Sequence, residues 1–151
     1  MTGKRPKPGD ILEVVAPNGL IYAHYLGKHP EYGDAIVVCP AIQSTAATIG
    51  PELFEGGYVT FYPVTASASR GFSSVVGHLP APGIPKRFRR PGAIYGRIVT
   101  TWIIEESSKE TVKETLSEEE LALPIAAIWN HELLVQRVSE GWRPETEGRH
   151  E

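Results

Sequence analysis

This sequence contains little cysteine and no long apolar run. Cys39 is the one cysteine among 151 residues, which excludes an internal disulfide framework and a metal site made of cysteines alone. No stretch approaches the roughly 18 consecutive apolar residues of a membrane-spanning helix. The basic start at residues 1–10 is followed by no apolar core, so we expect no secretory signal. These absences favour a cytoplasmic protein.

The composition of the chain is that of a folded domain. Hydrophobic residues make up 41% and charged residues 22%, and a length of 151 residues suits one domain over residues 1–151. The 15 glycines and 13 prolines exceed the usual share, so the chain is expected to turn often.

The first hundred residues have the pattern of antiparallel strands. Asn18-Gly19 separates two apolar runs and predicts a two-residue hairpin turn, because both central residues of a type I′ turn need a positive φ. Residues 79–91 contain four prolines and predict an irregular loop, since proline cannot donate to a strand ladder. Apolar or alternating stretches predict strands at residues 11–16, 20–26, 34–39, 57–62, 72–77 and 96–104.

The C-terminal part changes to helical signals. Ser117 and Glu120 have the spacing of a capping box, which opens a short helix. Asn130 can cap a second helix from residue 131 to about residue 140, and Gly141 suits the position after its last turn.

Together these patterns predict a mainly β (α+β) fold, a bent antiparallel sheet or partly open SH3-like barrel with short C-terminal helices. The β core would cover residues 8–104, the helical segment residues 117–142 and a polar tail residues 143–151. The start Lys7-Pro8-Gly9-Asp10 resembles the entry to the first strand of small barrels, among them the MazF/Kid-type ribonuclease toxins. That resemblance covers the first strand only, and it supports an SH3-like bend rather than a nuclease.

No pattern of residues predicts catalysis. The five histidines do not pair at metal-binding spacing, so a metal site would need ligands brought together from distant segments. Cys39 lies in an apolar strand and is expected to be buried and unreactive. Asp10, Glu13 and Asp34 lie near strand ends, where they could pair as acid and base, although a turn role is favoured for Asp10. We therefore predict no enzyme activity, no catalytic residues, no metal and no cofactor.

Charge is distributed unevenly along the chain. Residues 1–100 carry ten Lys/Arg and six Asp/Glu, net +4, whereas residues 101–151 carry five and twelve, net −7. The basic cluster surrounds Phe88 and is a candidate nucleic-acid surface, made of Lys86, Arg87, Arg89 and Arg90. The acidic block is a candidate surface for a protein partner, made of Glu105, Glu106, Glu110, Glu114 and Glu118. The interpretation that needs no binding partner is that the basic and acidic blocks solvate opposite surfaces or attract each other.

Three stretches resemble the immunity protein 26 family of bacterial polymorphic toxin systems. They are residues 7–34, Arg70-Gly71-Phe72 and the closing residues 117–146. The resemblance implies a predominantly β protein that binds and neutralises a toxin and has no catalytic residues. Such a protein blocks a nuclease by presenting acids to its basic substrate groove. The alternative is a nucleic-acid-binding small β-barrel module that uses the basic loop at residues 86–97, against which the net charge of −3 weighs.

Overall fold

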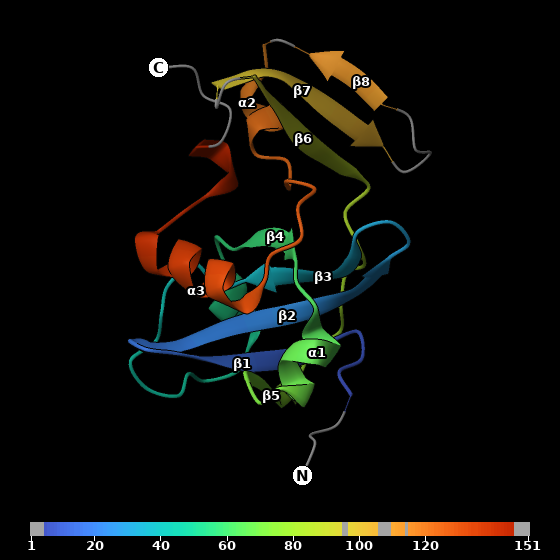
Figure 1. Ribbon diagram of the computed structural model, residues 1–151. Helices are drawn as coiled ribbons and strands as arrows, with labels where there is room; N and C mark the ends of the chain where they lie inside the picture. Colours follow the sequence, from blue (N-terminus) through green and yellow to red (C-terminus); the bar gives the residue numbers. More distant parts are fainter. Residues whose placement is uncertain (1–4, 95–96, 106–109, 114, 147–151) are drawn as a thin grey trace. The chain divides into compact units, whose positions relative to one another are not determined.

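The structure is a computed structural model, and it describes residues 5–94, 97–105, 110–113 and 115–146 (Figure 1). The chain forms two compact units. Unit 1 comprises Met1–Ile84 and Ile128–Trp142, and unit 2 comprises Pro85–Ala127 and Arg143–Glu151. The protein is mainly β, as the sequence predicts. Whether the chain behaves as one domain stays a prediction, because a division into compact units does not decide whether they unfold together.

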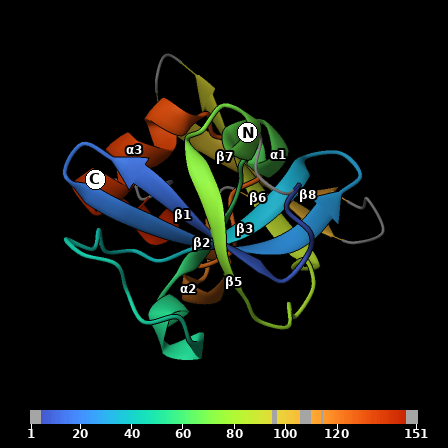
Figure 2. The same cartoon turned by 90° about the horizontal axis from the view of Figure 1, so that it is seen from below.

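Unit 1 is built on a five-stranded antiparallel sheet (Figures 1 and 2). The order in the sheet is β4-β3-β2-β1-β5, so the first four strands form a meander and the fifth returns beside β1. The strands are β1 (Asp10–Ala16), β2 (Gly19–His29), β3 (Gly33–Val38), β4 (Tyr58–Phe61) and β5 (Ser73–His78). All five correspond to strands predicted from the sequence.

The turn between β1 and β2 lies one residue earlier than predicted. Ala16 pairs with Gly19, which leaves Pro17 and Asn18 as the two turn residues. Because proline holds φ near −65°, this turn cannot be the type I′ turn expected for Asn18-Gly19. Gly19 instead opens β2 with a φ of +149°, and its neighbour Leu20 exchanges backbone hydrogen bonds of 2.8 and 2.9 Å with Gln43.

Two α-helices and a 3₁₀ helix complete unit 1. They are α1 (Val64–Ser69), η1 (Pro51–Phe54) and α3 (His131–Glu140). The predicted caps of α3 are confirmed, since the Asn130 side chain accepts a hydrogen bond from an amide in the first turn and Gly141 has a φ of +72°. The sequence patterns did not predict α1.

The core of unit 1 lies between the sheet and these helices. Cys39 is buried, as predicted, beside the side chains of Ile11 and Tyr22. Trp129 is buried as well, and its amide donates a 2.8 Å hydrogen bond to the carbonyl of Phe61 at the edge of β4. The segment before α3 therefore pairs with one edge of the sheet.

Unit 2 contains a smaller antiparallel sheet of order β6-β7-β8. Its elements are β6 (Arg87–Ile94), β7 (Arg97–Glu105), β8 (Glu110–Lys113), α2 (Glu118–Leu121) and η2 (Pro144–Thr146). The capping box that opens α2 is present as predicted.

The prediction of an irregular loop at residues 79–91 is wrong from Arg87 onward, because those residues belong to β6. Pro91 is tolerated there since β6 is an edge strand, where a residue without an amide proton leaves no inner ladder bond unmade. Strand β8 was not predicted. Neither sheet closes into a barrel among the described residues, and no helix within them is long and apolar enough to cross a membrane.

Candidate functional site

The predicted basic surface does not include Arg89. Its side chain is fully buried in unit 2, and its guanidinium donates hydrogen bonds to the carbonyls of Leu121, at 3.3 Å, and Pro144. Arg89 thus connects β6 to α2 and η2. A buried guanidinium that bonds to backbone carbonyls stabilises the fold and cannot contact a phosphate, so its assignment to this surface is corrected.

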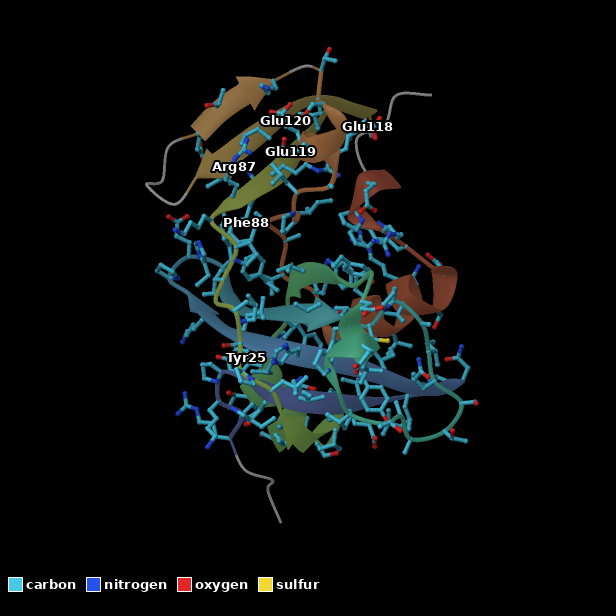
Figure 3. All side chains as sticks on the ribbon, turned by 180° about the vertical axis from the view of Figure 1, so that it is seen from behind. Tyr25, Arg87, Phe88, Glu118, Glu119 and Glu120 are labelled. Atoms are coloured by element: carbon cyan, nitrogen blue, oxygen red, sulfur yellow. The ribbon has the colours of Figure 1, made fainter. Side chains whose placement is uncertain are left out.

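The other arginines of the basic cluster lie beside acids of the same unit. Arg90 Nη2 is 3.4 Å from Glu110 Oε1, and Arg87 Nη1 is 4.0 Å from Glu119 Oε1 (Figure 3). Lys86 is exposed before β6 begins. Because these pairs are partly exposed, each contributes little stability, but each reduces the charge that either block presents to a partner. In unit 2 the two charge blocks of the sequence therefore partly neutralise each other.

Glu120 is a buried acid of this unit that is held by several bonds. Lys113 Nζ lies 2.5 Å from Glu120 Oε2, and the Ser117 amide donates to Glu120 Oε1 at 3.0 Å. The hydrogen bond from Lys113 and the one from Ser117 hold the pKa of this carboxyl below its usual value, although burial opposes them. Glu120 is a structural residue of the capping box.

The predicted acidic surface is only partly placed. Glu110 in β8 is exposed and paired with Arg90, and Glu118 is the exposed first residue of α2 (Figure 3). Glu106 and Glu114 lie outside the described residues, as does the side chain of Glu105. The structure therefore places the side chains of two of the five acids, Glu110 and Glu118, and the surface stays a prediction.

The three acids near strand ends do not meet. Each is bonded to a different side chain, Asp10 to His78 at 2.9 Å, Glu13 to Tyr22 at 2.7 Å and Asp34 to Tyr25 at 2.7 Å. The turn role of Asp10 is confirmed, because its carboxylate accepts a hydrogen bond from the Lys7 amide. Burial disfavours its charge, but the bonds from His78 and Lys7 outweigh that effect and lower the Asp10 pKa.

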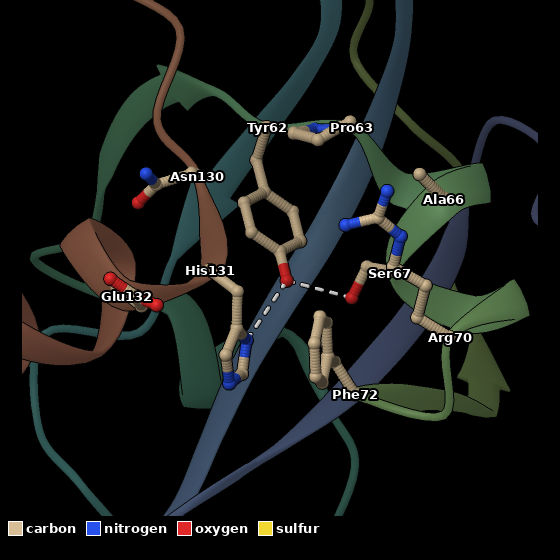
Figure 4. A pocket seen from close by; sticks show the side chains of 9 residues that line it. All are labelled: Tyr62, Pro63, Ala66, Ser67, Arg70, Phe72, Asn130, His131 and Glu132. Atoms are coloured by element: carbon tan, nitrogen blue, oxygen red, sulfur yellow. Dashed lines mark hydrogen bonds between the residues drawn. The ribbon is translucent and has the colours of Figure 1, made fainter.

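Unit 1 contains a pocket of about 360 Å³ between α1, the segment leading to β5 and the start of α3 (Figure 4). Its floor is a chain of hydrogen bonds. The Tyr62 hydroxyl donates to Ser67 Oγ at 2.7 Å and lies 3.3 Å from His131 Nδ1, and Ser67 Oγ lies 2.9 Å from Ser73 Oγ.

The walls of this pocket combine aromatic, apolar and charged side chains. The Phe72 ring stacks on His131 with centroids 4.1 Å apart and an interplanar angle of 11°. Burial raises the pKa of Tyr62, so its hydroxyl keeps the proton that it donates. Arg70 and Glu132 also line the pocket and are exposed. Sequence reasoning missed the pocket because its residues come from two stretches, 62–72 and 130–132, that lie far apart in the sequence.

Comparison with known proteins found no family model, no curated protein and no solved structure that matches this chain. The resemblance to immunity proteins therefore rests on the residues quoted for it. In the part of the chain that the structure describes, no group of three or more His, Cys, Asp or Glu residues is placed to hold a metal ion.

One edge of the unit 1 sheet is open. Strand β5 pairs with β1 and has no strand on its other side among the described residues. Val75 and Val76 in this strand are 36% and 39% exposed, and Val15 in β1 is 59% exposed. The Val15 amide donates to the carbonyl of Phe72 at 3.1 Å, so the residue before β5 extends the pairing with β1. Unpaired backbone and exposed β-branched side chains therefore occur together on β5.

Proposed function

We propose that this chain is a non-enzymatic, cytoplasmic binding protein that neutralises a bacterial toxin by direct contact. The resemblance of residues 7–34 and 117–146 to immunity proteins supports this class of function. The observation that carries the proposal is the open, apolar edge of β5.

Edge strands of monomeric proteins are normally protected by charges, proline or a covering segment. At the opposite edge of the same sheet, Phe61 is paired with the segment at Ile128 and Trp129. Strand β5, with the sequence SSVVGH, contains no proline and no lysine, arginine or carboxylate. Such an edge suits the addition of an extended strand from a protein partner, with backbone hydrogen bonds for affinity and the valines for apolar contact.

The acidic residues retain a supporting part in this proposal. Glu110 and Glu118 are exposed, and charges at the rim of an interface act chiefly on the rate of encounter. The nucleic-acid alternative has less support, because Arg89 is buried and Arg87 and Arg90 lie beside acids.

Co-expression with the product of the adjacent gene, which the proposal expects to be the toxin, tests the proposal. The wild-type chain should restore growth and co-purify with the toxin. Val75→Lys/Val76→Lys should abolish both effects, because charges on an edge strand oppose strand addition. Val112→Lys is the control, since Val112 is 55% exposed and belongs to the sheet of unit 2 rather than to the sheet that contains β5. Thermal unfolding of the three proteins checks that each variant folds.

Two results would contradict the proposal. One is a β5 variant that protects as well as the wild type, which would move the contact elsewhere. The other is a wild-type chain that gives no protection but binds an oligonucleotide with submicromolar, salt-sensitive affinity, which would favour the nucleic-acid alternative.

A further inference from the structure

The pocket of unit 1 has features that its own hydrogen bonds do not explain. Its floor needs no ligand, because Tyr62, Ser67 and His131 satisfy one another. Its walls, however, present two charged side chains of opposite sign. Within the described residues neither Arg70 nor Glu132 forms an ion pair with another side chain, and the two do not pair with each other.

The two charges belong to different elements. Arg70 follows the last residue of α1, and Glu132 lies in the first turn of α3. In Figure 4 the guanidinium of Arg70 turns back toward Ser67 and Tyr62, while Glu132 lies on the far side of His131. The rest of the lining is mixed: Tyr62, Phe72 and His131 are aromatic, Pro63 and Ala66 are apolar, and Ser67 and Asn130 are polar.

We propose that this pocket binds a small zwitterion of the amino-acid class with an apolar or aromatic side chain. The carboxylate of the ligand would bind the guanidinium of Arg70, which is suited to planar, two-point recognition of carboxylates. Its ammonium would bind Glu132, and its side chain would lie against Phe72. A pocket with an apolar wall and a few convergent polar groups is the usual form of a small-molecule site, and its volume of about 360 Å³ lies within the usual range.

A series of three probes with the same apolar body separates the contributions of the two charges. L-Phenylalanine carries both groups, 3-phenylpropanoate lacks the ammonium and phenethylamine lacks the carboxylate. Titration of the full-length chain is followed by amide chemical shifts. L-Phenylalanine should bind about fivefold or more tightly than either single-charge probe, and the shifts should concentrate at Arg70, Phe72, His131 and Glu132.

The variants should divide the probes by charge. Arg70→Gln should weaken L-phenylalanine and 3-phenylpropanoate about fivefold and leave phenethylamine unchanged. Glu132→Gln should weaken L-phenylalanine and phenethylamine and leave 3-phenylpropanoate unchanged or tighter. Lys28→Gln, an exposed change on β2 outside the pocket lining, is the control for net charge and should alter none of them.

Three outcomes would overturn the proposal: equal affinity for all three probes, shifts that lie away from the pocket, or no saturation by L-phenylalanine up to about 10 mM. Because the pocket test uses no toxin and the toxin test changes no residue of the pocket, failure of one leaves the other standing.

Discussion

Replacement of Gly19 by alanine should destabilise unit 1 through a steric contact that the structure locates. A Cβ at this position would lie 2.5 Å from the carbonyl oxygen of Gln43 and 2.6 Å from the Ile42 Cγ2 methyl. The first of these atoms belongs to the backbone and cannot be removed by a side-chain rotation. The φ of +149° adds strain, because L side chains rarely adopt it.

The cost has two parts. Positive φ at a non-glycine residue costs about 1–2 kcal/mol. Displacement of the Gln43 segment would also weaken the two backbone hydrogen bonds between Leu20 and Gln43, each of which contributes about 0.5–1.5 kcal/mol. We therefore expect Gly19→Ala to lower the free energy of unfolding by about 2–4 kcal/mol, and Gly19→Val by more.

Urea denaturation with a matched glycine control distinguishes the two parts. Gly33 has a φ of +85°, but a Cβ there would meet no atom within 4 Å, so Gly33→Ala should show the cost of φ alone. The midpoint of the Gly19→Ala transition should fall further than that of Gly33→Ala, with an unchanged m value. Equal midpoints would mean that the Gln43 segment moves aside freely, and would refute the steric argument.

Three further outcomes follow from the described contacts. Asn130→Ala should lower the free energy of unfolding by about 1 kcal/mol, because it removes the cap of α3. Asn130→Asp should retain most of the wild-type stability, and calorimetry of the two variants measures both effects. The pKa values of Asp10 and Glu120 are lowered by folding, so their contribution is complete above about pH 4–5 and is lost as pH falls through the lower folded values. Acid denaturation measures this loss of stability, and the loss should be smaller in Glu120→Gln, which lacks one of the two carboxyls. Cys39 should react slowly with a thiol reagent in the native protein and rapidly in urea, and equal rates would show that it is accessible.

Local sequence patterns predicted the fold where short-range chemistry decides it. The caps at Ser117 and Asn130, and the apolar strands of the meander, all depend on residues within a few positions of one another. The β1–β2 turn was misplaced by one residue because the Asn-Gly signal ignores the constraint of Pro17 on φ. Strand β6 was missed because Pro91 argues against a strand unless its edge position is known.

The candidate sites were less predictable than the strands. The basic cluster had the composition of a surface, but composition does not tell which arginine is covered, and α2 and η2 cover Arg89. The pocket unites Tyr62 with His131, which are far apart in the sequence, so only tertiary structure reveals it. The open edge of β5 likewise depends on strand order, which alternation along one strand does not encode.

The late pairing of Trp129 with the edge of β4 has a consequence for synthesis on the ribosome. The nascent chain completes β4 at Phe61, but the segment that pairs with this edge, through the Trp129 amide, emerges only after 68 further residues, from position 61 to position 129. At about 5–20 residues per second this interval lasts roughly 3–14 s. From the completion of β5 until the end of this interval the emerging sheet has two unpaired edges rather than one, since among the described residues β1 is the one strand that pairs with β5. The β4 edge during elongation is therefore where a ribosome-associated chaperone would be needed most, and a stall before residue 129 would favour aggregation through that edge.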